Sequence, residues 1–527
     1  MNRLIAILTT AVVLLMSGGS AVAQLKNVGT VAFPTSGSPE AQKYFLRGAA
    51  ILHSFGWKQA IEQFHKAQEL DPDFAMAYWG EALCYNHPLQ NEGNLEEPRQ
   101  VLKRLGATPE ARLAKAPTDR EKGFLRAVEA KFFNEGDAAQ RKFAYRDAMQ
   151  QLYEAYPNDH EVASYYALSL LSAASRMGGQ RHRVEVLAGS IAMKIFAENP
   201  NHPGGAHYTI HSFDDPVHAP MALPAAWKFA TIAAAVSHAR HMPSHIFIQR
   251  GIWEEVSKSN QSAYDAAVDL WESGDSVGDM VHALGWGQYG DLQRGDYEKA
   301  RAWISLLEEI LDKRVNPDQR LRMSRALAGV KARYIVETEQ WKTNPVTEKS
   351  PASELLATGI SAVKLGNISL AEQAEARLAK LAEKEQGEDR SPGTIQIMHG
   401  EVAALVHLAK GNKAKAVELL EVGVKMAEGM PPPRGPANAV KPVHEFFGEV
   451  LLDMGQSERS ITLFEKSLLR MPNRPRSLLG LARAYAKIGD KASARAHYEK
   501  LLEVWVGGRS MPGLKDTKRY IEASTDE

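Results

Sequence analysis

The 527-residue sequence has little that would tie it to a disulfide, a nucleic acid or a membrane. It contains one cysteine, Cys84, which excludes an internal disulfide and every cysteine-based zinc or iron–sulfur motif. Its 63 basic and 63 acidic side chains balance, so no overall field attracts nucleic acid, and we expect no nucleic-acid partner. Beyond the N-terminus no stretch approaches the roughly 18 apolar residues that a span requires, and we expect no membrane span.

The first 23 residues have the pattern of a secretory signal peptide. Arg3 precedes an apolar run over residues 4–16, and Ala21-Val22-Ala23 supplies an A-x-A cleavage site before Gln24. An uncleaved N-terminal anchor is the alternative interpretation. We expect cleavage between Ala23 and Gln24 and export of the mature chain, with the periplasm as its destination because the pattern is typical of bacteria.

The remaining sequence is repetitive, and its repeats predict pairs of antiparallel helices. Small and large residues recur at fixed spacings near both ends: Tyr44, Gly48, Ile51, Ala60, Phe64, Ala67 and Pro72, and again His444, Phe447, Gly448, Leu451, Gly455, Phe464 and Pro472. The small residues let two helices approach closely, the large ones fill the space between them, and proline ends the second helix. No alternating run is long enough to predict a strand.

These spacings resemble those of the tetratricopeptide repeat (TPR), whose period is about 34 residues. Gly455 and Gly489 stand one such period apart, and further glycines suited to helix C-caps stand at 295, 366 and 411. The resemblance implies an all-α superhelical array. A proline-containing break at 341–351 predicts a linker between two lobes, an N-terminal array over 24–340 and a C-terminal array over 352–507, followed by a tail over 508–527. A second break at 430–436 predicts a long loop inside the C-terminal lobe.

Histidines gather in one segment of the N-terminal array. Seven of the 17 lie between His202 and His245, and two pairs, His207/His211 and His241/His245, are spaced four residues apart. Residues four apart share one face of a helix, and one full TPR period separates the two pairs. We therefore expect the pairs at equivalent positions on the first helices of adjacent repeats. In TPR proteins these positions line the concave groove, so the resemblance implies that both pairs lie side by side in that groove, with His238 and His282 at its edge.

Converging imidazoles are typical ligands of zinc, copper or iron. The predicted metal ligands are His207, His211, His238, His241, His245 and His282, with Asp214, Asp215 and Asp279 as further ligands or as partners that orient the rings. Histidines with purely structural polar contacts, and a groove that responds to pH, remain alternatives. The sequence leaves open whether such a site stores metal or supports catalysis.

The residues around the histidines are poor helix formers. Pro203, Gly204 and Gly205 precede His207, and Pro243 stands between the histidines of the second pair. If Pro243 lies in a first helical turn its missing N–H is harmless, and otherwise it would kink the helix. The text HPGGAHYTIH followed by HARHMPSHIFIQRGIW resembles a cassette of exported bacterial TPR proteins, which implies no particular reaction. The second functional interpretation is a TPR scaffold whose groove binds a peptide or protein without metal and without catalysis.

Overall fold

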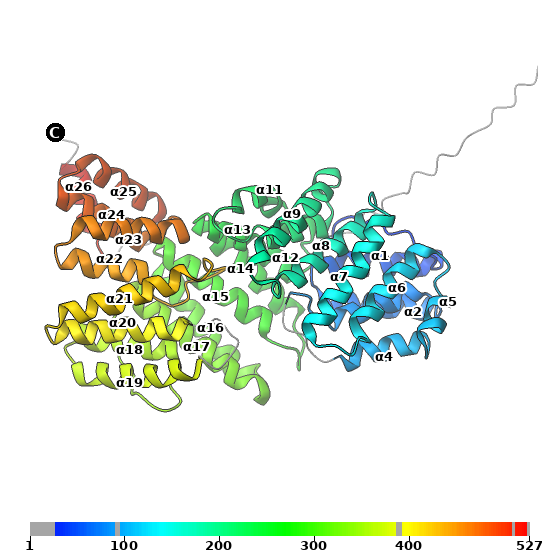
Figure 1. Ribbon diagram of the computed structural model, residues 1–527, viewed down its shortest axis with the longest axis horizontal. Coiled ribbons are helices and arrows are strands. Elements are labelled where there is room, and N and C mark those ends of the chain that lie inside the picture. The colour runs from blue at the N-terminus through cyan, green and yellow to red at the C-terminus, as the bar shows by residue number, and fades with distance from the viewer. Residues whose placement is uncertain (1–26, 90–94, 386–392, 508–511, 524–527) are drawn as a thin grey trace, which may run out of the picture.

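The computed structural model of the chain describes residues 27–89, 95–385, 393–507 and 512–523 (Figure 1). Within these ranges the chain forms 26 α-helices, one short 3₁₀ helix, η1 (Gly178–Gln180), and no β-strand. The predicted all-α array is therefore confirmed. The predicted signal peptide, its cleavage site and parts of the predicted tail lie outside the described residues.

The helices follow one another with short connections. The first half contains α1 (Pro39–His53), α2 (Trp57–Leu70), α3 (Ala75–Cys84), α4 (Glu96–Leu105), α5 (Pro109–Ala114), α6 (Asp119–Phe132), α7 (Ala138–Ala155), α8 (His160–Ala174), α9 (Arg181–Glu198), α10 (Pro203–Ser212), α11 (Ala219–Ile232), α12 (Ser237–His241) and α13 (Pro243–Gln249). The second half contains α14 (Trp253–Leu270), α15 (Gly278–Arg294), α16 (Tyr297–Lys313), α17 (Pro317–Thr338), α18 (Ala352–Lys364), α19 (Ile368–Glu385), α20 (Thr394–Ala409), α21 (Lys413–Glu428), α22 (Val443–Asp453), α23 (Ser457–Arg470), α24 (Pro475–Ile488), α25 (Lys491–Val504) and α26 (Leu514–Ala523).

Helices adjacent in sequence pack against each other, and the same contact recurs at both ends of the array. The ring of Phe64 on α2 lies between the glycine backbones of α1 and α3, where an added Cβ would lie 2.8 and 2.4 Å from it. The ring of Phe464 on α23 lies in the same way between α22 and α24, with 2.9 and 2.2 Å for the added Cβ. Because each aromatic ring needs two glycines facing it, this arrangement explains the predicted alternation of small and large residues.

The turn glycines predicted to cap helices do so. Gly295, Gly366, Gly411, Gly455 and Gly489 all have φ between 79° and 84°, a left-handed conformation that most side chains rarely adopt. Each permits a sharp turn after the first helix of a pair, and this returns the chain antiparallel to itself.

The array falls into two lobes joined by the central helices α13 to α17 (Figure 1). The largest hydrophobic cluster lies mainly between Val28 and Val256 and extends to Trp286, Tyr289, Ala437 and Met471, and a second one runs from Ala332 to Leu463. Residues 339–351 form no helix between α17 and α18. The loop 429–442 between α21 and α22 is also non-helical, and it reaches from the C-terminal lobe to α13 (Figure 1). No helix in the described ranges is both long and apolar enough to cross a membrane.

Candidate metal centre

Three successive first helices supply the six predicted histidines. His207 and His211 lie on α10, His238 and His241 on α12, His245 on α13, and His282 on α15. Because α11 and α14 are the second helices between them, the spacing of one repeat period places the two pairs on neighbouring elements, as the sequence predicted. The helix of the second pair is divided at Met242, and Pro243 is the first residue of α13, where its missing N–H is harmless.

The poor helix formers at the start of α10 allow a close approach to α1. His202 caps the helix by accepting a hydrogen bond at Nδ1 from the Gly205 N–H, at 3.0 Å. A Cβ on Gly204 would lie 2.7 Å from Nδ1 of His53 on α1, and one on Gly205 would lie 3.0 Å from the backbone of α9. The two glycines thus bring α10 against both helices, which sets the position of His207.

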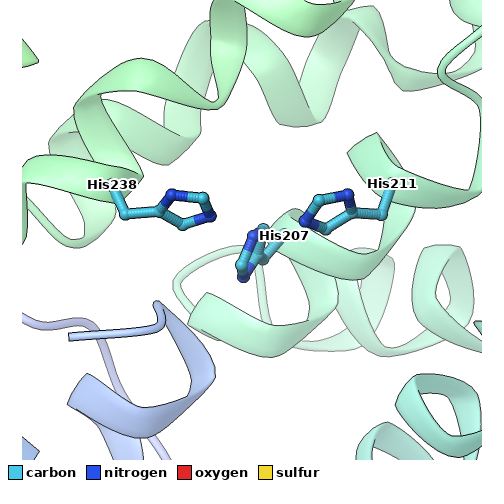
Figure 2. Close-up of side chains that lie close together, drawn as sticks. All are labelled: His207, His211 and His238. Carbon is cyan, nitrogen blue, oxygen red and sulfur yellow. The ribbon is translucent and has the colours of Figure 1, made fainter. Parts of the chain in front are cut away.

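His207, His211 and His238 form the inner site, in which the rings approach one another from three sides (Figure 2). One ring nitrogen of each lies within 4.8 Å of the others. The Nε2 atom of every one of the three is buried and has no hydrogen-bond partner. Three buried acceptors or donors without partners are unfavourable, and a bound ion is one ligand that would satisfy all three.

The protonation of His207 is set by its neighbour on α1. Its Nδ1 lies 2.6 Å from the His53 backbone carbonyl, which can only accept, so Nδ1 carries the proton. Burial lowers the pKa of His207 to about 3 and the pKa values of His211 and His238 well below their usual range. The rings are therefore neutral near pH 7, and Nε2 of His207 presents a lone pair. A metal-binding histidine is commonly fixed in this way through its other nitrogen.

Aromatic rings enclose the inner site. Phe55 stacks on His238 with ring centroids 5.4 Å apart, and Phe229 stacks on His207 at 5.0 Å. The three rings lie among α10, α11, α12 and the turn after α1, with His207 buried and His211 and His238 half-buried. No carboxylate is hydrogen-bonded to them among the described residues.

His241, His245 and His282 form the outer site. Nε2 of His241 lies 3.1 Å from Nε2 of His245 and 3.0 Å from Nε2 of His282. Nδ1 of His241 donates to Oδ1 of Asn260 at 2.6 Å, and Nδ1 of His245 donates to Oδ2 of Asp214 at 2.8 Å. With both Nδ1 protons committed, the Nε2 lone pairs of His241 and His245 face each other.

A single proton cannot satisfy these contacts. If Nε2 of His282 donates to Nε2 of His241, the lone pair on Nε2 of His245 still faces Nε2 of His241 without a proton between them. A metal ion would accept all three lone pairs at once. Two nitrogens bound tetrahedrally at 2.0–2.1 Å stand roughly 3.3 Å apart, close to the separations in the outer site. The geometry and the donor set therefore fit a transition metal.

The inner and outer sites are neighbours, and the sequence did not predict that the histidines would form two separate sites. The rings of His211 and His245 have centroids 6.0 Å apart, and those of His238 and His241 6.1 Å apart. The sequence predicted two pairs side by side, without assigning the histidines to separate groups. In the structure each pair stays together and gains a third ring from the next first helix, so two groups of three result.

The three predicted aspartates have different surroundings. Asp214 is buried, orients His245 and accepts a second hydrogen bond from Gln249 at 3.1 Å. Asp215 instead bonds the ring and backbone of His218, away from the six histidines. Asp279 lines a small cavity with His238, His241 and His282, and desolvation raises its pKa.

A third group, which the sequence analysis did not identify, supports the inner site from behind. Glu161 on α8 accepts from Nε2 of His53 at 2.8 Å and from Nε2 of His202 at 3.1 Å, while Tyr208 bonds Nδ1 of His53. All these ring nitrogens have partners, so this group holds no vacant ligand atom and serves to fix α1 against α10. No spacing signal exists for it, because Glu161 and His53 are 108 residues apart.

Comparisons with known proteins agree with a repeat architecture. A tetratricopeptide repeat family model matches residues 447–505, within the C-terminal lobe. This stretch therefore consists of TPRs, as the resemblance implied. No curated protein matches the sequence.

Several solved helical-repeat structures are similar to the chain at low identity. The human IFIT1 dimer with PPP-AAAA is 13% identical, with 89% of this chain and 91% of that chain covered and a TM-score of 0.35. Yeast Tom70 is 12% identical, with 92% and 96% covered and a TM-score of 0.30. These values carry no implication for what the chain binds.

Proposed function

We propose that the protein binds transition-metal ions at the inner and outer sites. The observation that carries this proposal is the inner site, where one ring nitrogen of each of three histidines lies within 4.8 Å of the others and the three buried Nε2 atoms have no hydrogen-bond partner. The outer site supports it independently, because its Nε2 atoms approach within 3.0–3.1 Å while Asp214 and Asn260 hold two of the rings by their other nitrogens. Zinc, copper and iron are the ions that such imidazole sets prefer.

Three histidine ligands leave a fourth coordination position for water or another molecule. A metal bound in this way can lower the pKa of water or polarise an oxygen ligand. His282 is exposed and lies at the solvent side of the outer site, so a fourth ligand would reach that site there. This placement supports metal handling with exchange, or metal-dependent catalysis, at the outer site.

We further propose that the protein is exported. The signal pattern over residues 1–23 supports this, and a metal centre built from histidine alone suits a compartment in which thiols are readily oxidised. Cell fractionation followed by N-terminal sequencing tests it. The expected N-terminus of the exported protein is Gln24, and recovery of the chain beginning at Met1 in the exported fraction would contradict cleavage.

Metal analysis of the purified protein tests the main proposal. Wild-type protein should contain, or take up after dialysis against Zn²⁺, up to two ions per chain as measured by mass spectrometry of the metals. His211→Ala should remove the inner ion and His282→Ala the outer one, and the helical circular dichroism should be kept. His399→Ala, in the C-terminal lobe beside Glu375, is the matched control and should change nothing. Equal metal content in all four proteins, or none in any, would refute the proposal.

The alternative is a scaffold that binds a peptide or protein. The TPR match over 447–505 favours it, because arrays of such repeats commonly bind peptides. Affinity capture with a Lys466→Glu variant, changed in the exposed part of α23, tests whether this lobe recruits a partner. A partner retained by wild type and lost by the variant, in a protein that takes up no metal, would favour the scaffold.

A further inference from the structure

A cavity of about 780 Å³ lies in the C-terminal lobe, where the loop 429–442 meets α20, α21 and α23. Its walls are largely apolar and include Ile397, Met426, Met471 and the prolines of the loop. Four basic side chains line it as well: Arg181, Lys425, Arg434 and Arg470. No aspartate or glutamate is among the residues that line it.

The positive charge of this cavity is only partly neutralised. Arg181 and Arg434 both donate to the same oxygen of Glu185, at 2.9 and 2.7 Å, so two cations share one carboxylate. Arg470 donates to the backbone carbonyls of Met430 and Pro431, at 3.1 and 3.2 Å. Lys425 has no hydrogen-bond or ion-pair partner among the described residues.

His444 adds a polar atom that lacks a partner. Its side chain lines the cavity and is 4% exposed, and its Nε2 has no hydrogen bond. The carboxylate of Glu428 lies 3.7 Å away but is itself paired with Lys466 at 2.7 Å. Burial and Arg470 lower the pKa of His444 to about 4, so the ring is neutral near pH 7 and can donate one hydrogen bond to a ligand.

We propose that this cavity binds a small organic anion, a carboxylate carried on an apolar body. The positive charges of Lys425 and Arg470 would hold the carboxylate, and the proline and methionine walls would bury the body. The volume falls within the range of roughly 300–1,000 Å³ typical of small-molecule sites. The consecutive prolines of the loop fix its backbone, which reduces the ordering needed when a ligand binds.

The cavity is separate from the metal centre, but the two share the loop. The Pro433 carbonyl accepts from Nε2 of Gln249 at 2.9 Å, and the same nitrogen donates to Asp214, which orients His245. A Cβ on Gly435 would lie 2.7 Å from Trp286, whose ring packs on His241 and His245. The loop thus contacts Gln249 and Trp286 beside the outer site and also lines the cavity.

Calorimetric titration of the full-length mature protein with sodium decanoate tests the proposal. We expect saturable binding of one decanoate per chain, weakened by added salt, with no binding of decyltrimethylammonium. Lys425→Gln should weaken decanoate binding about tenfold, since it removes a charged hydrogen-bond donor, and Lys425→Glu should weaken it further. Lys380→Gln, an exposed lysine on α19 outside the cavity, is the matched control and should bind as wild type does.

Both Lys425 and Lys380 are exposed, so neither change threatens the fold. Arg470→Gln gives a second variant, whose melting temperature shows whether the loop has stayed in place. The titrations are made with metal-free and with Zn²⁺-treated protein, so failure of the metal proposal leaves this test intact. The proposal is refuted if decanoate fails to bind, if the ammonium surfactant binds equally well, or if Lys425→Glu has no effect. It is also refuted if a free peptide carboxylate binds the cavity and decanoate does not.

Discussion

Replacing Asp214 by asparagine should disable the outer site through a single proton. In the wild type, Oδ2 of Asp214 accepts from Nδ1 of His245, and Oδ1 accepts from Gln249. Gln249 is held in that orientation because its Nε2 also donates to the Pro433 carbonyl. An asparagine can keep the bond from Gln249 only by turning its own NH₂ group toward His245.

That orientation of the asparagine forces His245 into its other tautomer. Nδ1 of His245 must then accept, so the proton moves to Nε2, the atom that faces His241 and would bind the metal. Loss of an orienting carboxylate of this kind lowers metal affinity by about 10–100-fold, or about 1.4–2.7 kcal/mol. Among the described residues no hydrogen bond joins Asp214 to the three inner histidines, so the inner site should keep its affinity.

Competition between the protein and a chromophoric chelator for Zn²⁺ measures the two affinities separately. The chain offers a control in the next residue, because Asp215→Asn makes the same chemical change beside His218 and outside both sites. We expect a weaker second equivalent of Zn²⁺ for Asp214→Asn and wild-type behaviour for Asp215→Asn. If both variants bind alike, or if Asp214→Asn weakens both equivalents equally, the argument from the His245 tautomer is wrong.

Three further predictions concern stability. Free Zn²⁺ at 100 times its dissociation constant should stabilise the protein by about 2.7 kcal/mol, seen as a rise in melting temperature that a chelator reverses. Gly204→Ala should cost roughly 1–3 kcal/mol in chemical denaturation because its Cβ meets His53, whereas Gly179→Ala, with nothing within 4 Å, should cost little. Glu401 is buried with both carboxylate oxygens unpartnered, and desolvation raises its pKa well above 4.5. The unfolded chain releases this proton near pH 4.5 while the folded chain retains it, so the stability of the protein falls as the pH rises above 4.5. Glu401→Gln removes this titration. It should therefore stabilise the protein at pH 8 by roughly 1 kcal/mol or more and leave its stability unchanged at pH 4.

The sequence predicted the fold well because the determinants of a repeat array are local. The packing contacts join residues of neighbouring helices, as between Gly48 and Phe64 and between Gly448 and Phe464. The spacing of these residues in the sequence therefore indicates the packing directly. The turn glycines are likewise predictable, because glycine is the residue that most readily adopts the positive φ that these turns require. The domain boundaries and export remain predictions, since neither follows from helix packing.

The candidate site was only partly predictable. The repeat period identified the helices that carry His207 and His241, but it could not show which rings would group together. That grouping depends on Phe55 and Phe229, which fill the space beside His238 and His207, and on the close approach that Gly204 permits. Contacts between residues far apart in the sequence, such as that between His53 and Glu161, leave no mark in local spacing.

The surroundings of the two sites indicate different roles for two bound ions. The inner site is neutral and enclosed by aromatic rings, and no carboxylate hydrogen-bonded to it offsets a divalent charge, so an ion there would exchange slowly or be monovalent. The outer site has Asp214 as a compensating charge one ring away and His282 at the solvent side. We therefore expect ligand exchange and any chemistry at the outer site, and we expect an inner ion to hold α10 and α12 together beside it. The loop 429–442 contacts both Gln249 and Trp286, so the C-terminal lobe helps to position the residues around the outer site.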